Sequence, residues 1–184
     1  MSEVSYEQRR GQIENYFDRT AAAAWAKLTS DAPVGRIRAT VRAGRDQMRS
    51  TLVSWLGNDL RGKRILDAGC GTGNAWQGLG VRYPSARVVA LDIAPGMLRQ
   101  ARAALSWHQR LLRRGPLAVC GDLERLPLSG GSIDLAWSNL ALQWVNALPR
   151  AFAEIYRVLA PGGLFLFTTF GPDTLKELRA AQAD

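Results

Sequence analysis

The stretch Arg64–Gly73, RILDAGCGTG, decides the fold of this chain. An apolar run ends on Asp67, and Gly69, Gly71 and Gly73 follow at alternate positions. Glycine adopts backbone conformations that are closed to other residues and lets a ligand approach the main chain. The pattern therefore predicts a strand that turns sharply into a helix, with a ligand bound over the turn.

Beyond Gly62 the sequence alternates between short apolar runs and helical stretches. The apolar runs are RILDAG, ARVVALD, PLAVCGD, SIDLAWSN and GLFLFTTF, and the helical stretches cover 75–83, 95–114, 147–159 and 174–181. This alternation predicts a Rossmann-like α/β fold, a mostly parallel sheet with helices on both faces. GLFLFTTF is apolar on both faces, which favours an interior strand, yet only one helix follows it. We expect an uncovered strand that offers an edge for a homo-oligomer.

Residues 5–56 read as helix, because Ile13, Tyr16, Phe17, Thr20, Ala24 and Leu28 recur at helical spacing. Asp31-Ala32-Pro33 breaks this pattern before a second helix begins. We expect residues 1–60 to form an N-terminal helical lid and residues 61–184 to form the Rossmann-like core of a single structural domain.

The composition bounds the functional class. The chain has 184 residues with 24 Lys and Arg against 16 Asp and Glu, a net charge of +8, which favours an acidic partner. No apolar run reaches the roughly 18 residues of a membrane span, and the N-terminus lacks the apolar segment of a signal peptide. Cys70 and Cys120 are too few for a disulfide framework and are expected to be buried thiols. These features predict a cytoplasmic protein.

The glycine loop does not match a dinucleotide fingerprint. That motif needs glycine at its first, third and sixth places, but the sixth place holds Asn74 counted from Gly69 and Trp76 counted from Gly71. Asp67 would also repel a pyrophosphate. The same carboxylate would attract a cationic ammonium, and S-adenosylmethionine is an adenosyl ligand that carries one.

Three further strand ends support this ligand. Asp92 closes VVALD at the distance from the loop where an acid binds a ribose diol. Asp122, in Cys120-Gly121-Asp122-Leu123, can accept from an adenine amino group, and Ser138-Asn139 follow the fourth run. The alternative is that Asp67 and Asp92 only cap helices. The ordered set favours S-adenosylmethionine as the cofactor.

The region from Lys63 to Phe170 resembles a class I methyltransferase, with DAGCGTG as its first motif. The resemblance implies a set of cofactor-binding residues: Asp67, Ala68, Gly69, Cys70, Gly71, Gly73, Asp92, Ile93, Met97, Gly121, Asp122, Leu123, Ser138 and Asn139. Enzymes of this class that methylate nucleobases commonly carry an Asn/Asp-Pro-Pro-aromatic motif after the fourth strand. Here that place reads SNLALQWV, which argues against a nucleic-acid substrate.

Two narrower resemblances cover different parts of the chain. From about residue 74 to 184, GDLERLPL, DLAWSNLALQWV, YRVLAPGG and TTFGPDTLKELRAA resemble malonyl-acyl-carrier-protein O-methyltransferase of the biotin pathway. From about residue 16 to 73, YFDRTAAAAWAKLT and IRATVRAGRDQMRSTL resemble magnesium-protoporphyrin IX O-methyltransferase. The chain departs from the malonyl family at Ala24, where that family usually has tyrosine. Both families continue with further strands, so we expect a shortened chain. A natural fusion, an engineered splice near the glycine loop or an unusual relative would each explain the two resemblances, and a splice at the shared motif is the simplest account.

Both resemblances imply methyl transfer to a carboxylate. A carboxylate is ionised at neutral pH and needs no general base. His108, the single histidine, reads as a surface residue, and no cluster has metal-ligand spacing, so we expect no metal. The catalytic candidates are Tyr16, as a substrate-positioning residue on the lid, with Asn139 and Trp144 on the far side of the site. Gln143 and Trp144 are equally consistent with packing.

The net positive charge fits an acidic substrate carrier. Arginines gather on two predicted helices, Arg36, Arg38, Arg42, Arg45 and Arg49 on one and Arg99, Arg102, Arg110, Arg113 and Arg114 on or beside the other. They could attract an acidic acyl carrier protein or form a solvated helix face. For a porphyrin, Trp25, Trp55 and Trp76 would be apolar walls. The first expectation is a malonyl-carrier O-methyltransferase; the alternatives are magnesium-protoporphyrin methylation and a catalytically silent module that binds S-adenosylmethionine.

Overall fold

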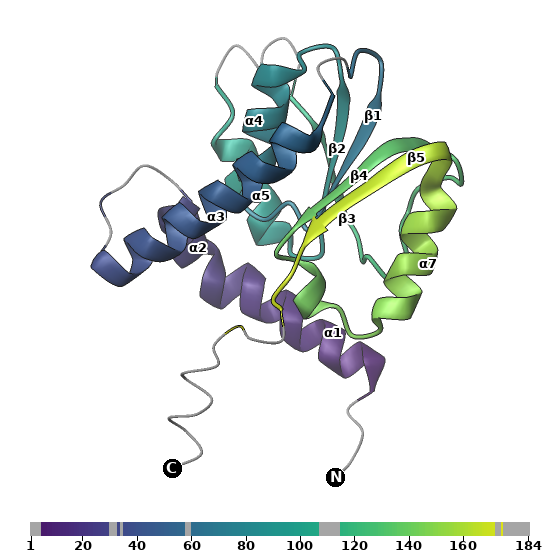
Figure 1. The fold of residues 1–184 in the computed structure, drawn as a ribbon. Helices are drawn as coiled ribbons and strands as arrows, with labels where there is room; N and C mark the ends of the chain where they lie inside the picture. Colours follow the sequence, from purple (N-terminus) through teal and green to yellow (C-terminus); the bar gives the residue numbers. More distant parts are fainter. Residues whose placement is uncertain are drawn as a thin grey trace.

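The computed structural model describes residues 5–29, 33, 35–57, 60–106, 115–171 and 174. Its helices are α1 (Tyr6–Asn15), the π-helix η1 (Tyr16–Ala21), α2 (Ala22–Thr29), α3 (Arg36–Trp55), α4 (Asn74–Arg82), α5 (Pro95–Ala103), the 3-10 helix η2 (Leu142–Trp144) and α7 (Leu148–Val158). Its strands are β1 (Arg64–Ala68), β2 (Arg87–Asp92), β3 (Leu117–Cys120), β4 (Ile133–Asn139) and β5 (Leu159–Thr168). The predicted fold class is confirmed (Figure 1).

The five described strands are parallel and lie in the order β3-β2-β1-β4-β5. The chain builds the sheet outward from β1 on one side and then crosses to the other side with β4. Asp67 of β1 is therefore paired with Ala90 of β2 and with Trp137 of β4. In an open sheet this reversal creates a crevice at the carboxyl ends of the strands.

Successive residues of each strand pack against opposite layers. Ile65 and Leu135 face a core formed with Leu52 of α3 and Leu79 of α4. On the other face, the core consists of strand side chains together with residues of α7 and of the loop after β3: Leu66, Ala136, Leu126, Ile155 and Val158 among them. This period-two alternation places helices on both faces, as the apolar runs predict.

The N-terminal helices α1, η1 and α2 lie across the carboxyl ends of the strands (Figure 1). Ser5 caps α1, because its hydroxyl accepts from the Gln8 N–H while the Gln8 side chain accepts from the Ser5 N–H. The π-helical turn η1 docks on α5: the carboxylate of Asp18 accepts hydrogen bonds from the Gly96 N–H and from Arg99. A Cβ at Gly96 would lie 2.6 Å from that carboxylate oxygen, so the close contact requires glycine.

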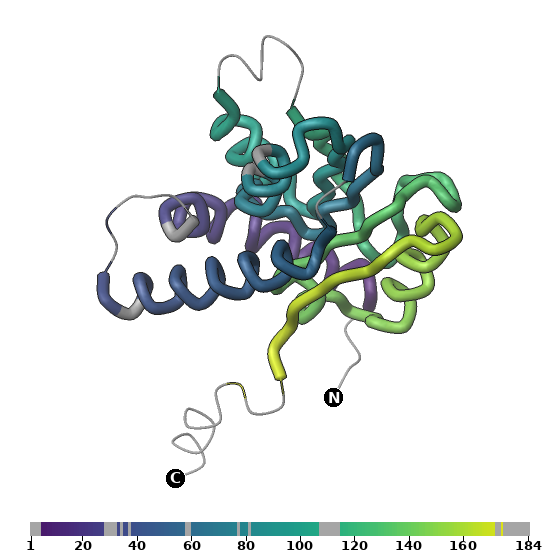
Figure 2. Tube along the Cα trace, turned by 45° about the horizontal axis from the view of Figure 1, so that its top comes forward, coloured from purple at the N-terminus to yellow at the C-terminus, as the bar shows by residue number. Residues whose placement is uncertain are grey.

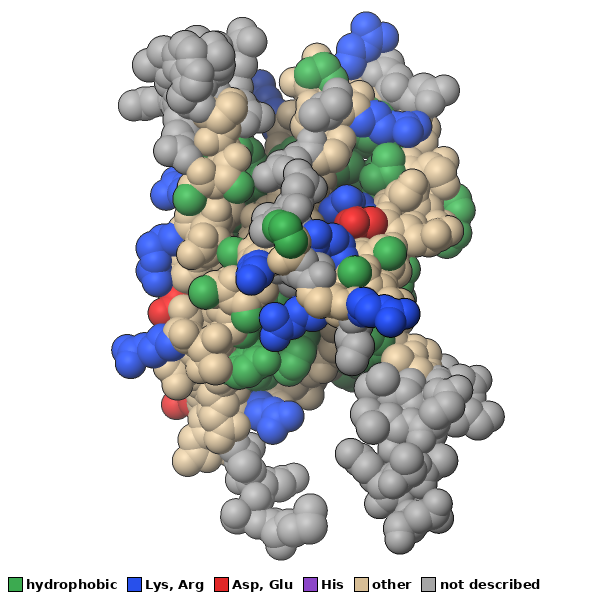
Figure 3. Space-filling model, turned by 90° about the vertical axis from the view of Figure 1, so that its left-hand side faces the viewer, with side chains coloured by type: hydrophobic (Ala, Val, Ile, Leu, Met, Phe, Trp, Pro, Cys, Tyr) green, Lys and Arg blue, Asp and Glu red, His purple; other side chains and the backbone are tan. Residues whose placement is uncertain are grey.

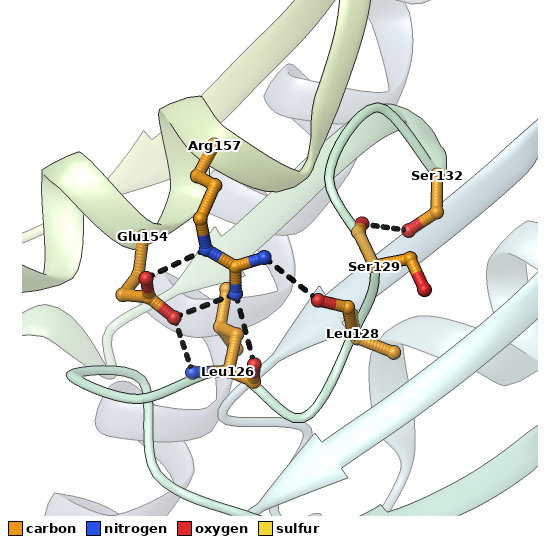
Figure 4. A network of polar contacts seen from close by, with 6 residues as sticks. All are labelled: Leu126, Leu128, Ser129, Ser132, Glu154 and Arg157. Atoms are coloured by element: carbon orange, nitrogen blue, oxygen red, sulfur yellow. Dashed lines mark hydrogen bonds and ion pairs between the residues drawn. The ribbon is translucent and has the colours of Figure 1, made fainter.

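A polar network fixes α7 to the loop that follows β3 (Figure 4). Arg157 donates to both carboxylate oxygens of Glu154, at 2.7 and 2.8 Å, and to the carbonyls of Leu126 and Leu128. Glu154 in turn accepts from the Leu126 N–H at 2.7 Å. Bidentate pairs of this kind hold geometry as well as charge. The loop after β3 is therefore rigidly placed where it forms one wall of the crevice.

Three details differ from the predicted pattern, and a fourth is left untested. The helix predicted to reach Arg114 ends at Ala103, because the chain turns and Leu105 packs over Gly115; residues 107–114, with His108, lie outside the described residues. β5 begins at Leu159, before the predicted run, and its pairing with β4 is irregular at Ile133 and Leu135. Cys70 is buried as expected, but Cys120 is exposed. The predicted helix 174–181 lies mostly outside the described residues.

β5 lies at one edge of the described sheet, rather than inside it, and α3 runs toward it (Figure 2). Phe152 of α7 contacts Phe165 and Phe167 of β5, with ring centroids 6.1 and 5.9 Å apart. Phe152, Leu164 and Phe167 stay exposed. The run is apolar on both faces, as the sequence shows, but within the described residues only β4 pairs with it.

Candidate functional site

A pocket lies between the carboxyl ends of the strands and the N-terminal helices. Its walls come from the ends of β1, β2, β3 and β4, from the loops that follow them, and from α1, η1, α2 and α3. It occupies the point where the strand order reverses, which is where open α/β sheets bind ligands.

The glycine loop brings the main chain to the surface of this pocket. Gly69 has a φ of 74°, and a Cβ on it would lie 2.3 Å from the Cβ of Ala141 in the loop after β4. No other residue fits this turn without moving that loop. The N–H groups of Gly69 and Cys70 both donate to the Leu91 carbonyl at 2.9 Å, which joins the loop to β2.

Asp92 connects the glycine loop to the start of α5. Its Oδ2 accepts from the Gly71 N–H at 2.8 Å, and its Oδ1 accepts from the Ala94 N–H at 3.0 Å. Burial raises the pKa of Asp92, and the donated hydrogen bonds oppose that shift. Each carboxylate oxygen retains a further lone pair, so the group can still accept from a ligand in the pocket.

Asp67 is the acid of the site for which neither carboxylate oxygen has a described hydrogen bond, whereas Oε1 of Glu124 accepts from the Asn146 and Ala147 N–H groups. The Asp67 side chain is 2% exposed, and Oδ2 has no hydrogen-bond partner in the described part of the chain. Burial, and secondly the nearby Asp92 carboxylate, raise the pKa of Asp67 to about 7. A buried carboxylate without a partner is costly in free energy. The site is therefore built for a cationic or hydrogen-bond-donating group.

Asp122 is held by the first helix. Tyr6 donates its hydroxyl to Oδ2 of Asp122, Arg10 lies 3.6 Å from the same oxygen, and the Glu124 N–H donates to Oδ1 at 2.9 Å. Burial, followed by the hydrogen bond to Asp122, raises the pKa of Tyr6 to about 12. α1 is thus fastened to the end of β3 at the place predicted for an adenine amino group.

The end of β4 is braced by β5. The Thr168 hydroxyl donates to Oδ1 of Asn139 at 2.5 Å and accepts from the Leu140 N–H at 3.1 Å. Leu140 has a φ of 54°, which is unusual for a residue other than glycine, and Gln143 donates to its carbonyl at 2.7 Å. These contacts orient Asn139 with its carbonyl oxygen engaged, so its amide NH₂ is the group available to a ligand.

Replacing Thr168 by valine should lower the free energy of unfolding by about 1 kcal/mol, because Asn139 loses its part-buried hydrogen-bond donor, while the Leu140 N–H keeps the Thr168 carbonyl as its acceptor at 3.1 Å. Thermal unfolding would show this as a drop in Tm of several degrees. Thr168→Ser, which keeps the hydroxyl, is the matched control and should stay close to the parent protein. Equal melting temperatures for the valine and serine variants would contradict the bracing role.

Aromatic side chains from the N-terminal helices meet the loop after β4. Phe17 and Trp144 line the pocket and contact each other edge to face, with ring centroids 4.9 Å apart. Tyr16 stacks on Trp144 at 6.1 Å, is 44% exposed and does not line the pocket. Tyr16, which the sequence predicts as a substrate-positioning residue, thus packs on Trp144 outside the pocket lining, whereas Phe17 of η1 lies in it, and the role of Tyr16 stays a prediction. Tyr6 is the tyrosine that lines the pocket.

The arginines of α3 divide into two groups. Arg36 and Arg38 are exposed, whereas Arg42, Arg45 and Arg49 line the pocket at spacings of three and four residues, which places them on one face of the helix. Arg42 donates to the Lys27 carbonyl at 2.9 Å, and Arg49 pairs with Asp46 at 3.0 Å. The structure therefore removes three arginines from the predicted outer surface and places them in the wall of the site.

The structure brings most of the predicted cofactor residues together. The pocket is lined by Asp67, Gly69, Cys70, Gly71, Asp92, Ile93, Met97, Gly121, Asp122, Leu123 and Asn139. Ala68 and Ser138 are fully buried and do not line it, and neither does Gly73, whose Cα faces the ring of Trp76. Of the predicted tryptophan walls, Trp25 lines the pocket, Trp55 is exposed and Trp76 is buried behind the loop.

The sequence reasoning missed the contribution of α1. Tyr6, Arg10, Ile13 and Phe17 all line the pocket and follow one another at spacings of four, three and four. That period is the signature of one helix face, and it was present in the sequence. The mixture of polar and apolar residues on this face concealed it.

Two negative findings concern the described ranges alone. No group of three His, Cys, Asp or Glu side chains there is arranged to hold a metal ion. No helix there combines the length and the apolar character that crossing a bilayer requires.

A parallel sheet with its reversal at β1, a glycine turn and acids at successive strand ends define a Rossmann-like nucleoside-binding protein. Comparison with known families makes this specific. The chain belongs to the methyltransferase domain family, which it matches over residues 66–167.

Named relatives lie within the methyltransferases. The malonyl-[acyl-carrier protein] O-methyltransferase of Methylovorus sp. (strain MP688) is 58% identical over 125 residues, which cover 66% of this chain and 42% of the relative. The same enzyme of Gallionella capsiferriformans (strain ES-2) is 52% identical over 123 residues, again 66% of this chain and 42% of the relative. The chain thus spans less than half the length of these curated relatives.

Solved structures give the same class. Magnesium protoporphyrin IX methyltransferase from Synechocystis PCC 6803, crystallised with bound SAM, is 25% identical with a TM-score of 0.69, covering 87% of this chain and 74% of that one. An S-adenosylmethionine-dependent methyltransferase from Mesorhizobium loti is 35% identical with a TM-score of 0.58, covering 67% and 53%.

Proposed function

We propose that this chain is the catalytic core of an S-adenosylmethionine-dependent carboxyl O-methyltransferase that acts on malonyl-acyl carrier protein, a step of biotin biosynthesis. The single observation that supports it best is the buried, unpartnered Asp67 beside the braced Asp92 at the switch point of the sheet. Relatives that are 43–58% identical and are named malonyl-[acyl-carrier protein] O-methyltransferase support the choice of acceptor.

The residues present fit the proposed cofactor. Asp67 would accept from its ammonium group, Asp92 from its ribose hydroxyls, and Ile93, Met97 and Leu123 would supply an apolar surface for adenine. Asp122 would accept from the adenine amino group, in exchange for or beside Tyr6. When bound, S-adenosylmethionine supplies an electrophilic methyl group on a positively charged sulfur.

The chain's own residues then position an acceptor rather than move protons. An ionised carboxylate attacks carbon without a general base, so the pocket must align it and exclude water. The Asn139 amide can donate to a carboxylate oxygen, since its own carbonyl is engaged by Thr168. Phe17 and Trp144 cover the pocket from the side of the N-terminal helices. A hydrogen-bond donor at Asn139 and an aromatic cover together would orient an anionic acceptor and exclude water from it.

The surface supports an acidic carrier as partner. Figure 3 views the side on which α2 and α3 lie in Figure 1, and Lys and Arg side chains there outnumber acidic ones. Arg36, Arg38 and Arg102 are exposed, and Arg99 is exposed while it pairs with Asp18. Arg110, Arg113 and Arg114 lie outside the described residues. Positive patches of this kind raise the rate of encounter with an anionic protein.

A second acceptor is favoured by one observation. The magnesium protoporphyrin IX methyltransferase structure is 25% identical and its superposition covers 87% of this chain, the N-terminal helices included in that length. A porphyrin propionate is also a carboxylate, so the same chemistry would apply. The two candidates differ in the acceptor. A porphyrin needs an apolar wall in the pocket, and of the three predicted tryptophans Trp25 lines it.

The deciding assay incubates the protein with methyl-labelled S-adenosylmethionine and, separately, malonyl carrier protein, magnesium protoporphyrin or RNA. We expect label in the malonyl carrier, released as methanol by mild base because the product is an ester. Acetyl carrier protein, which lacks the free carboxylate, is the matched control and should stay unlabelled. Transfer to the porphyrin alone would overturn the malonyl assignment, and silence with all three would favour a binding module.

A further inference from the structure

Arg45 is a charged residue of the pocket to which the proposed mechanism gives no role. It lies on α3, and its guanidinium carbon is 4.4 Å from the ring centroid of Trp25 on α2. Both residues line the pocket. Stacking on an aromatic face holds a guanidinium plane while its edge, with the N–H donors, stays available.

Arg45 forms no ion pair among the described residues, because Asp46, the acidic neighbour that acts to raise its pKa, is paired with Arg49 at 3.0 Å. Its neighbours on the same helix face are engaged elsewhere, Arg42 with the Lys27 carbonyl and Arg49 with Asp46. Among the described residues, Arg45 makes no hydrogen bond or ion pair, and burial lowers the pKa of its guanidinium. Burying a cation whose acidic neighbour is already paired with another arginine costs free energy that an anionic ligand would recover.

The acids at the strand ends and the arginines of α3 line different walls of the pocket, and α3 also carries Asp46, which is paired with Arg49. Asp67, Asp92 and Asp122 come from the ends of β1, β2 and β3, where the adenosyl group would lie. Arg45 comes from the wall formed by the N-terminal helices, and Phe17 and Trp25 give this wall its apolar surface. A cationic cofactor suits the first wall, and an anionic acceptor suits the second.

We propose that Arg45 is the positioning residue that binds the acceptor's carboxylate through one oxygen and leaves the other oxygen to attack the methyl carbon. This inference rests on the proposed function. In the reaction a C–O bond forms, the methyl–sulfur bond breaks, the sulfonium becomes a neutral thioether, and no proton is transferred. The carboxylate becomes a neutral ester, so its ion pair with Arg45 disappears and product release is favoured.

The test measures binding without turnover. Protein saturated with S-adenosylhomocysteine is titrated with S-malonyl-N-acetylcysteamine and with its methyl ester, in wild type, Arg45→Met, Arg45→Lys and Arg87→Met. We expect wild type to bind the free acid at least tenfold more tightly than the ester, because hydrogen bonds to charged groups are strong. Arg45→Met should reduce this ratio to below about twofold, and Arg45→Lys should keep part of it. Arg87, exposed at the opposite end of the sheet, should keep the full ratio.

Two results with Arg45→Met would overturn the proposal: an unchanged ratio, or a tenfold loss of S-adenosylhomocysteine affinity, which would assign Arg45 to the cofactor. The same titration with magnesium protoporphyrin and its monomethyl ester separates this proposal from the choice of acceptor. If wild type prefers the acid to the ester only in the porphyrin pair, and Arg45→Met loses that preference, the Arg45 assignment stands and the malonyl acceptor is rejected. A wild-type protein that distinguishes acid from ester in neither pair would reject the Arg45 assignment.

Discussion

Replacing Asp92 by alanine should weaken the binding of S-adenosylhomocysteine at least a hundredfold. In the proposed complex both ribose hydroxyls donate to this carboxylate, and a hydrogen bond to a charged group contributes about 1.5–3 kcal/mol. Losing two of them corresponds to about 3 kcal/mol or more, which is a factor of a hundred in the dissociation constant. The same change releases the Gly71 and Ala94 N–H groups that Asp92 holds at 2.8 and 3.0 Å, and this adds to the loss.

A thermodynamic cycle separates the ligand contact from the support of the loop. Calorimetry on wild type and Asp92→Ala would use S-adenosylhomocysteine and its 2′,3′-dideoxy analogue. Removing the hydroxyls should cost wild type about a hundredfold in affinity and cost the variant little, since the two changes remove one shared interaction. If the hydroxyls mattered equally in both proteins, the ribose assignment would be wrong, even with a large effect of the mutation itself.

Below pH 7 the affinity for the same ligand should fall, approaching tenfold for each pH unit. Burial and the neighbouring Asp92 raise the pKa of Asp67 to about 7, so in the unliganded protein Asp67 is increasingly protonated as the pH falls below that value. The cationic ammonium binds the ionised form, and the proton must leave before the ion pair forms. Titrations between pH 5.5 and 8 would measure the slope.

Asp67→Asn is the control for this dependence. The amide has nearly the same shape and cannot ionise, so the variant should bind at least tenfold more weakly at pH 8, with a flat pH profile in this window. A variant that keeps the slope of the wild type would show that another group titrates. A wild type with no slope would contradict the ammonium contact at Asp67.

Raising the pH strengthens ligand binding through the ionisation of Asp67, but the same ionisation lowers the free energy of unfolding of the unliganded protein. The pKa of Asp67 is about 7 in the folded chain, against about 3.9 for an ordinary aspartate in the unfolded chain. Its contribution to the free energy of unfolding is therefore complete below about pH 4 and is lost as the pH rises through about 7. S-adenosylhomocysteine should accordingly raise the Tm more at pH 8 than at pH 6.

Local patterns were sufficient to predict the core of the fold. Each apolar run contains enough β-branched and aromatic residues to form a strand, and period-two burial follows from the pleat. The glycines of 69–73 show where the chain must turn, because the backbone conformation at Gly69 excludes a side chain. The acids at the carboxyl ends of parallel strands meet at one edge of the sheet, so Asp67, Asp92 and Asp122 could be assigned to one site before any contact was known.

Local patterns were insufficient wherever packing between distant segments decides the outcome. Tyr16 and Phe17 are neighbours in the π-helix η1, and of the two only Phe17 lines the pocket. Arginines on α3 look alike in the sequence, although Arg38 faces solvent and Arg45 stacks on Trp25. Thr168 has no motif, and its role comes only from its position opposite Asn139 in the β4–β5 pairing.

The sequence by itself determined the parallel α/β core, the glycine turn and the acids that surround a cationic adenosyl ligand. These features depend on residues close together in the chain or on strand ends that the topology aligns. Only the tertiary structure decided how the N-terminal helices close the pocket, which tyrosine and which arginine they bring to it, and that Asp122 is already engaged by Tyr6. The physical reason is that packing across long separations depends on the shape and partner of each side chain, and periodicity within one segment does not contain that information.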